Sequence, residues 1–167
     1  MKKLFLAAMC IFLTGCSTGA DVNETAYVRA AAVDSGKVTF SFYLDEKVIS
    51  VEADSLESAE SAAELAVGKE IFTGHTELVI LSDCDKKGVI EYMLRQWKVS
   101  PSCRIAEAEN GMEVLKKRKA EEIADVLAKA EEKGVTEKCG IVTVLGQFLK
   151  DGTAELPFLN GEGDLQN

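Results

Sequence analysis

Histidine is nearly absent from this sequence of 167 residues, in which His75 is the only one. A single histidine cannot build a catalytic or metal-binding site without partners, and its neighbours Thr73, Thr76 and Glu77 form no recognisable triad or ligand set. We interpret His75 as a structural residue at the entrance of a strand, with an interface contact that titrates near neutral pH as the alternative. No catalytic residue, metal ligand or cofactor is predicted, and the chain is not expected to be an enzyme.

Glycine-rich phosphate loops and closely spaced cysteine pairs are also missing. Gly134 and Gly146 are isolated, so nucleotide binding is not expected. Cys84, Cys103 and Cys139 lie far apart and lack the two-residue gaps that are typical of zinc sites. We interpret these cysteines as buried small hydrophobic residues, with one disulfide as the alternative.

Basic residues are in the minority, with 19 Lys and Arg against 28 Asp and Glu and a formal net charge of −9. This balance disfavours nucleic-acid binding. Anionic lipid headgroups would also repel such a surface, so a basic patch is not expected to hold the protein at a membrane. The folded part is expected to stand clear of the headgroups.

Long hydrophobic runs are missing as well. The run that follows Lys2 and Lys3 extends only from Leu4 to Leu13, whereas a membrane-spanning helix needs about 20 apolar residues. Two lysines before a short apolar run are typical of a secretory signal.

The run ends in the sequence Leu13-Thr14-Gly15-Cys16, which is a full lipobox. The chemistry of this motif cuts the chain between Gly15 and Cys16 and attaches a diacylglyceryl group to the sulfur of Cys16. Several acyl chains on one cysteine anchor a protein stably. We predict a lipoprotein signal peptide at residues 1–15 and lipidation of Cys16; an ordinary secretory signal and a first core helix are the alternatives.

The remainder divides by composition into a flexible tether at residues 16–24, one domain at 25–159 and a tail at 160–167 that is expected to fray. Within the domain, three runs at 27–33, 37–43 and 47–53 are rich in Val, Phe, Tyr and Ile and are separated by turn residues, which predicts a β-meander.

A helix is predicted to begin at the cap Ser55 and to end at Gly68, with Glu57, Glu60 and Glu64 on its solvated face. The continuous apolar run at 77–81 predicts a central strand that is buried on both faces.

A second helix is predicted from the cap Asp85 to a stop at Pro101, with Trp97 in the core, and a strand follows at 103–108. Strand, helix and strand in this order predict a βαβ unit.

Residues 110–133 are predicted to form one long helix. Residues 141–149 fit either a strand or a helix, of which we favour the helix. The fold class predicted is α+β with an α/β-like part: a mixed sheet of about four to six strands, with an N-terminal meander and a βαβ unit, packed against four or five helices.

This order of features resembles the N-terminal domain of the Ger(x)C family of spore germination lipoproteins, the C subunits of nutrient germinant receptors. The similarity runs along nearly the whole chain beyond the signal. The motifs that carry it are the lipobox, the early strand at 27–34, the run Phe72-Thr73-Gly74-His75-Thr76-Glu77-Leu78-Val79-Ile80-Leu81, the helix that ends Tyr92-Met93-Leu94-Arg95, the strand at 104–108, and the closing Phe148-Leu149-Lys150 with Leu156-Pro157. Two features depart from the family: Ser17-Thr18-Gly19-Ala20 stands where members carry a tryptophan and a charged cluster, and members continue into further domains where this chain ends at Asn167.

The resemblance implies a non-enzymatic subunit, or a truncated relative, of a germinant receptor that consists of the N-terminal domain only. It would be held by lipid on the outer face of the cytoplasmic membrane, the inner membrane of a spore. Its partners would be a multi-spanning A subunit and a transporter-like B subunit, and it would act in germination through protein contacts. Gly74, His75 and Arg95 are the candidate interface or structural residues. The alternative function is that of a small surface lipoprotein that binds a solute for a transporter, and no small-molecule ligand is identified.

Overall fold

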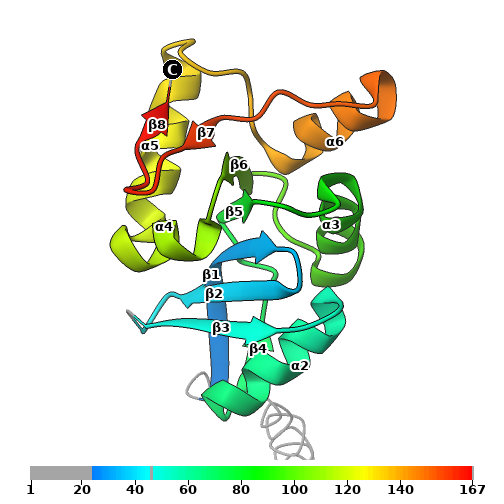
Figure 1. The fold of residues 1–167 in the computed structure, drawn as a ribbon, viewed down its shortest axis with the longest axis vertical. Coiled ribbons are helices and arrows are strands. Elements are labelled where there is room, and N and C mark those ends of the chain that lie inside the picture. The colour runs from blue at the N-terminus through cyan, green and yellow to red at the C-terminus, as the bar shows by residue number, and fades with distance from the viewer. Residues whose placement is uncertain (1–23, 46, 167) are drawn as a thin grey trace, which may run out of the picture.

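The computed structural model describes residues 24–45 and 47–166. The predicted signal peptide at 1–15 and nearly all of the tether, residues 16–23, therefore lie outside the described residues. Within the described residues the strands form one mixed sheet of eight strands (Figure 1).

The N-terminal part of the sheet is the predicted antiparallel meander of β1 (Thr25–Asp34), β2 (Lys37–Phe42) and β3 (Val48–Glu52). The register between β1 and β2 runs from Val28 opposite Phe42 to Asp34 opposite Lys37. Gly36 has a φ of 71° in the tight turn between them, a conformation that side chains disfavour.

The rest of the sheet is largely parallel. β1 lies beside β5 (Leu78–Leu81), which pairs in parallel with β6 (Arg104–Ala108). The path ends with β7 (Phe158–Leu159), parallel to β6, and β8 (Leu165–Gln166), antiparallel to β7. β4 (Glu70–Phe72) pairs in parallel with the first residues of β1. The mixed sheet is as predicted, but it has more strands than the four to six expected, because β4, β7 and β8 are too short to show an alternating pattern.

Helices cover both faces of this sheet (Figure 1). The buried residues of α2 (Leu56–Val67), α3 (Lys86–Tyr92), the π-helix η2 (Met93–Trp97) and α6 (Ile141–Asp151) share one hydrophobic cluster. The large buried side chains of α4 (Gly111–Lys117) and α5 (Ala120–Glu132) belong to a second cluster on the other face. Residues 141–151 are therefore helical, which was the favoured reading.

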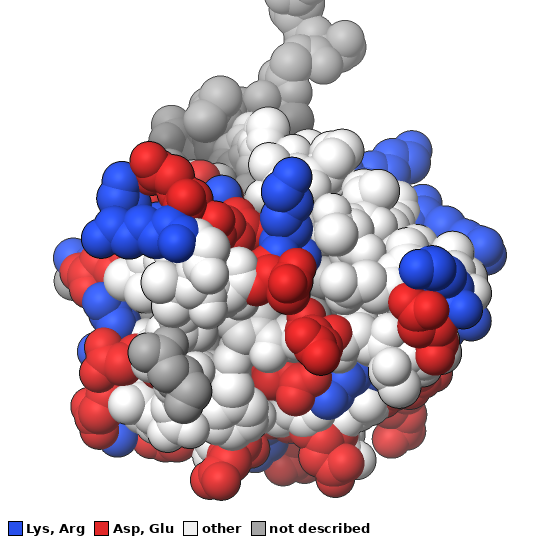
Figure 2. All heavy atoms as spheres, turned by 90° about the horizontal axis from the view of Figure 1, so that it is seen from above, with Lys and Arg blue, Asp and Glu red and all other residues white. Residues whose placement is uncertain are grey.

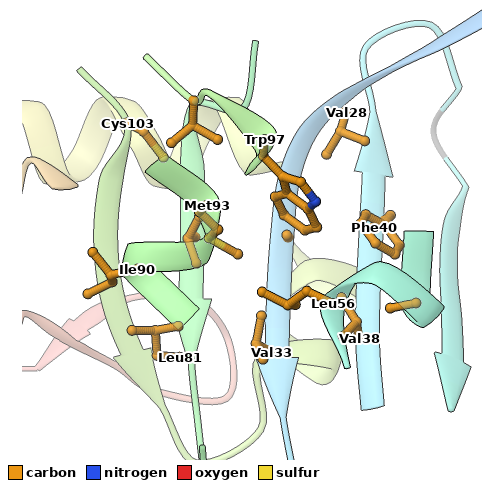
Figure 3. Packing of buried hydrophobic residues seen from close by; sticks show 14 of the residues in the cluster. Val28, Val33, Val38, Phe40, Leu56, Leu81, Ile90, Met93, Trp97 and Cys103 are labelled. Carbon is orange, nitrogen blue, oxygen red and sulfur yellow. The ribbon is translucent and has the colours of Figure 1, made fainter. Parts of the chain in front are cut away.

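The central strands supply side chains to both clusters in alternation. Val79 and Leu81 of β5 belong to the first cluster, and Leu78 and Ile80 belong to the second. Figure 3 shows the first cluster, in which Leu81 lies near Ile90 of α3. Residues 78–81 of the predicted strand are thus covered on both sides, as predicted, whereas Glu77 before them is exposed.

Three helix caps are present, of which Ser55 and Asp85 were predicted. The Ser55 hydroxyl accepts a hydrogen bond from the Ser58 amide, and the Asp85 carboxylate accepts one from the Gly88 amide, each at 3.1 Å. The Asn110 side chain accepts from the Glu113 amide at the same distance. Each cap satisfies an amide that has no partner inside its own helix.

The single helix predicted for 110–133 is wrong, because the chain breaks between α4 and α5. Arg118 is extended there, with φ −133° and ψ 141°. Its guanidinium donates to the Gly163 carbonyl at 2.9 Å and to the Asp164 carboxylate at 2.7 Å. Helical periodicity continues across the break, so the sequence pattern does not reveal it.

Two other boundaries differ from prediction. The second helix ends at Trp97 rather than at Pro101, since Lys98 takes a left-handed conformation with φ 52°. Residues 160–166, within the tail predicted to fray, form the turn between β7 and β8 and β8 itself, and the Asn160 side chain accepts from the amides of Glu162 and Asp164 there, each at 2.9 Å.

Candidate interaction surface

A tight turn precedes β5 and presents the only histidine of the sequence. The amide and the hydroxyl of Thr76 both donate to the carbonyl oxygen of Thr73, at 3.1 and 2.6 Å. Both threonines are buried, and these two bonds satisfy the amide and the hydroxyl of Thr76 inside the turn. Gly74 and His75 stand at its tip, where His75 is exposed.

His75 lies in an aromatic cluster with Tyr27 and Phe72. Its ring centroid is 5.1 Å from that of Phe72 and 6.1 Å from that of Tyr27. The rings of Tyr27 and Phe72 meet edge to face at 5.6 Å. Phe72 remains 43% exposed, so the cluster forms part of the surface rather than of the core.

Tyr43 and Arg29 extend this surface along the meander. The Tyr43 hydroxyl donates to the His75 carbonyl at 2.8 Å, and the Arg29 guanidinium lies 4.3 Å from the centre of the Tyr43 ring. Burial, and after it the neighbouring Glu77 carboxylate, raise the pKa of Tyr43 to about 12. The phenol is therefore neutral at physiological pH and serves as a hydrogen-bond donor.

Two carboxylates hold the guanidinium of Arg29. Its Nη1 donates to Glu121 at 2.6 Å, and its Nε lies 3.8 Å from Glu77. The Nε atom itself is buried without a hydrogen-bond partner among the described residues. Glu121 is more than half exposed, so this ion pair is screened by solvent and contributes little to stability.

An open hollow of about 450 Å³ lies beside this network. Arg29 and Tyr43 line it from the meander, and Lys116, Lys119 and Glu121 line it from the junction of α4 and α5. Its walls are mostly charged, whereas pockets for small molecules are mostly apolar.

The predicted site residues fall at separate places. His75 and Gly74 belong to one turn, whereas Arg95 is exposed on η2, and no recorded interaction between described residues joins it to His75. Gly15 and Cys16 lie outside the described residues. Cys84, Cys103 and Cys139 are free thiols; Cys103 and Cys139 are buried and Cys84 is partly buried.

The sequence reading missed four residues of the surface: Tyr27, Arg29, Tyr43 and Phe72. Tyr27, Arg29 and Phe72 lie on strands and Tyr43 directly follows β2, and only contacts between distant segments bring the four residues together. Three of these residues stand in motifs that carry the family resemblance, Tyr27 and Arg29 in the early strand at 27–34 and Phe72 at the start of the run that contains His75.

The predicted solvated face of the first helix is also wrong in part. The Glu60 carboxylate accepts a hydrogen bond from the Trp97 indole at 3.1 Å, and the Glu64 carboxylate accepts one from the Ile71 amide at 3.1 Å. Burial raises the pKa of Glu60, and the Trp97 hydrogen bond opposes that rise. Trp97 itself is in the core, as predicted.

The surface formed by the aromatic cluster, Tyr43 and Arg29 can make stacking, apolar and hydrogen-bonding contacts.

Within residues 24–45 and 47–166 there is no group of three or more His, Cys, Asp or Glu side chains able to hold a metal ion. None of the helices in this described part is long and apolar enough to cross a membrane. On the face seen in Figure 2, acidic and basic side chains are interspersed.

Residues 19–160 match the protein family described as "Spore germination protein N-terminal domain". Among the described residues, the matched segment includes every strand and helix except β8. Neither a curated protein nor a solved structure matches the chain.

Proposed function

Because the chain belongs to the family of spore germination proteins that share this N-terminal domain, we propose that it is a non-enzymatic subunit, or a truncated relative, of a nutrient germinant receptor. It acts in germination by contacting other proteins. The observation that carries this proposal is the family match, which extends from the sequence before β1 to the turn after β7.

The lipobox supports a membrane location. In this proposal the signal is cut between Gly15 and Cys16, and acyl chains on Cys16 hold the domain on the outer face of the cytoplasmic membrane, the inner membrane of the spore. A position at the membrane surface would bring the domain close to the multi-spanning A subunit and the transporter-like B subunit.

The aromatic cluster of Tyr27, Phe72 and His75 supports a role in protein contact. Aromatic side chains supply large contact areas and are enriched in protein interfaces. Exposed large apolar side chains are otherwise few among the described residues. We propose that the turn at Gly74 and His75 contacts a receptor subunit, and that Arg95 on η2 contributes a second, separate contact.

An affinity purification from detergent-solubilised sporulating cells tests this function. The bait is the full chain, compared with Cys16→Ala, His75→Ala and Arg95→Ala variants. Lys150→Ala is the matched control, since Lys150 is 82% exposed and its nearest carboxylate is 4.0 Å away in Asp151. We expect the A and B subunits to co-purify with the unchanged chain and with Lys150→Ala. We expect the three other variants to recover less of both.

Recovery of the bait alone would contradict a stable receptor complex. The alternative, a lipoprotein that binds a solute for a transporter, would then be the function to test. A solute that binds the folded chain raises its melting temperature in proportion to the logarithm of solute concentration. Such a shift with a small molecule, together with failure to recover the subunits, would establish the alternative.

A further inference from the structure

The strand β3 forms one edge of the sheet. Among the described residues it has β2 on one side and no strand on the other. Its five residues make it longer than β8, the two-residue strand at the opposite edge. β3 contains no lysine or proline, and its register with β2 is continuous, without a bulge. It therefore lacks the features that commonly protect an edge strand from pairing with another strand.

The pairing with β2 determines which backbone groups of β3 point outward. The Ala53 amide donates to the Gly36 carbonyl at 3.1 Å, and these residues are opposite each other when the register of β2 and β3 is continued by one position. Opposite pairs in an antiparallel ladder alternate between those that exchange hydrogen bonds and those that do not. Ile49 and Val51 therefore exchange hydrogen bonds with β2.

The other three residues of β3 direct their amides and carbonyls away from β2. They are Val48, Ser50 and Glu52, of which Ser50 and Glu52 are exposed. Within the described part of the chain, no other backbone group bonds to these amides and carbonyls. The edge thus presents three residues in a row with donors and acceptors ready for a further strand.

We propose that β3 is the surface through which two copies of this chain associate, by antiparallel pairing with β3 of the second copy. The inference does not depend on the proposed receptor role. Such a pair has a two-fold axis, so its edge must be complementary to itself. With the axis at Ser50, Ser50 lies opposite Ser50 of the second copy, and Val48 lies opposite Glu52 of the second copy.

This register satisfies the whole edge. Each of the three outward residues then has an opposite outward residue with which it exchanges both backbone hydrogen bonds. A shift by two residues in either direction leaves Val48 or Glu52 without an opposite residue inside β3. The edge is therefore self-complementary in one register, and this favours a second copy of the chain over an unrelated strand.

The apolar side chains of β3 support the same register. Ile49 and Val51 are partly buried and pack against the first hydrophobic cluster, which includes buried residues of α2. The proposed pairing sets Ile49 opposite Val51 of the second copy on the same face of the sheet. Cross-strand pairs of apolar residues stabilise a sheet, so the clusters of the two copies would meet across the joined edges.

The acidic charge of the chain does not oppose this pairing locally, although the formal net charge is −9. Glu52 is the only charged residue of β3. The two Glu52 residues would lie about 13 Å apart along the strands, since four residues at about 3.3 Å each separate them. This distance exceeds the screening length of about 8 Å at physiological ionic strength, so repulsion between them is weak.

Cysteine cross-linking of the full chain in the cells that produce it tests the pairing. Ser50→Cys places two thiols opposite each other, where a separation of about 5.5 Å between Cα atoms is within the range that a disulfide spans. Ser102→Cys is the matched control. Ser102 is also exposed, its hydroxyl also makes one side-chain hydrogen bond, and three strands separate β3 from β6, which it precedes.

After oxidation with copper phenanthroline, we expect Ser50→Cys to give a disulfide-linked dimer of the chain on a non-reducing gel. Ser102→Cys should give no more dimer than the unchanged chain, which reports the background from the natural cysteines. Equal dimer in both variants, or none in Ser50→Cys, would overturn the pairing. A disulfide from Ser50→Cys to a different protein would show that another protein occupies the edge, and it would overturn association between copies.

A charge at the same position tests the interface without a cross-link. Ser50→Lys sets two ammonium groups opposite each other, and like charges in that position destabilise a pair of strands. Native mass spectrometry of the full chain released from detergent should show that the dimer dissociation constant rises about fivefold, whereas Ser102→Lys leaves it unchanged. Circular dichroism verifies that both variants are folded. Equal dissociation constants for the two folded variants, or an unchanged chain that stays monomeric, would overturn the proposal.

Discussion

The Phe72 ring occupies the space in which a side chain at Gly74 would begin. Its Cζ atom lies 2.8 Å from the position that a Cβ atom on Gly74 would take, which is closer than carbon atoms approach without displacement. Glycine at position 74 therefore allows Phe72 to fold back over the turn and to meet His75 at 5.1 Å between ring centroids. The geometry gives a physical reason for a glycine directly before the histidine.

A Gly74→Ala substitution is expected to open the aromatic cluster without unfolding the domain. The ring of Phe72 is partly exposed and can rotate into solvent, so the free energy of unfolding should fall by no more than about 1 kcal/mol. The ring-current shifts of the His75 protons in the NMR spectrum should diminish. Gly161→Ala is the control, since a Cβ there meets nothing within 4 Å. Unchanged His75 shifts in Gly74→Ala would contradict the prediction.

Local sequence patterns predicted those strands and helix starts that are determined by residues close together in the sequence. The run at 37–43, rich in Val, Phe and Tyr, predicted β2, and the hydroxyl of Ser55 predicted the start of α2. The break at Arg118 could not be read in this way, because its cause lies in the contacts with Gly163 and Asp164, 45 and 46 residues away.

The candidate surface was predictable only in part for the same reason. Gly74 and His75 are adjacent in sequence, but the partners Tyr27 and Tyr43 come from the meander. Likewise, the hydrogen bond from Trp97 to Glu60 joins residues 37 apart, and helical spacing alone assigned Glu60 to solvent.

A Glu60→Gln substitution should stabilise the domain at neutral pH but not in acid. Burial raises the pKa of Glu60 in the folded state, so the folded protein holds this proton to a higher pH than the unfolded chain does. Stability is therefore lost as the pH rises through the folded pKa. The glutamine stays neutral, and its amide oxygen can still accept the Trp97 hydrogen bond.

Urea unfolding of Glu60→Gln and of the unchanged chain, at pH 7 and again below the range in which free glutamate titrates, measures this effect. The gain should be present at pH 7 and should vanish in acid. Glu57→Gln, an exposed change on the same helix, controls for the loss of one negative charge. A gain of equal size at both pH values would show that ionisation of Glu60 is not the cause.

Two glycines at helical positions should respond in opposite directions to alanine. A Cβ at Gly111 would lie 2.8 Å from the Ala32 Cβ and 3.1 Å from the Ile80 Cγ2, so Gly111→Ala should cost about 1–3 kcal/mol of unfolding free energy through overpacking. A Cβ at Gly146 meets nothing within 4 Å, so Gly146→Ala should add about 0.5–1 kcal/mol by favouring the helix. Thermal unfolding of the two variants provides the measurement, and a loss of stability in Gly146→Ala would contradict the open environment of that residue.

The three free cysteines of the domain should resist alkylation while it is folded. Burial raises the pKa of Cys84 to about 11 and the pKa values of Cys103 and Cys139 to about 12 each. Only the thiolate reacts, and its fraction at a given pH falls tenfold for each unit by which the pKa rises. At pH 8 we expect iodoacetamide to modify Cys84 about a hundredfold more slowly than an unfolded thiol, by this relation, and the other two more slowly still.

The order of alkylation tests the geometry, because Cys84 is only partly buried whereas Cys103 and Cys139 are buried. Tryptic mapping after timed alkylation should find Cys84 modified first, and unfolding in urea should make all three react at similar rates. The raised pKa values also imply that stability falls as the pH rises above the range of a free thiol toward 11 and 12, since the unfolded chain releases these protons first. Modification of Cys103 before Cys84 in the folded chain would contradict the burial of Cys103. A disulfide in the purified protein would contradict the free thiols. The alternative interpretation of the sequence, in which two of the three cysteines form one disulfide, would then be correct.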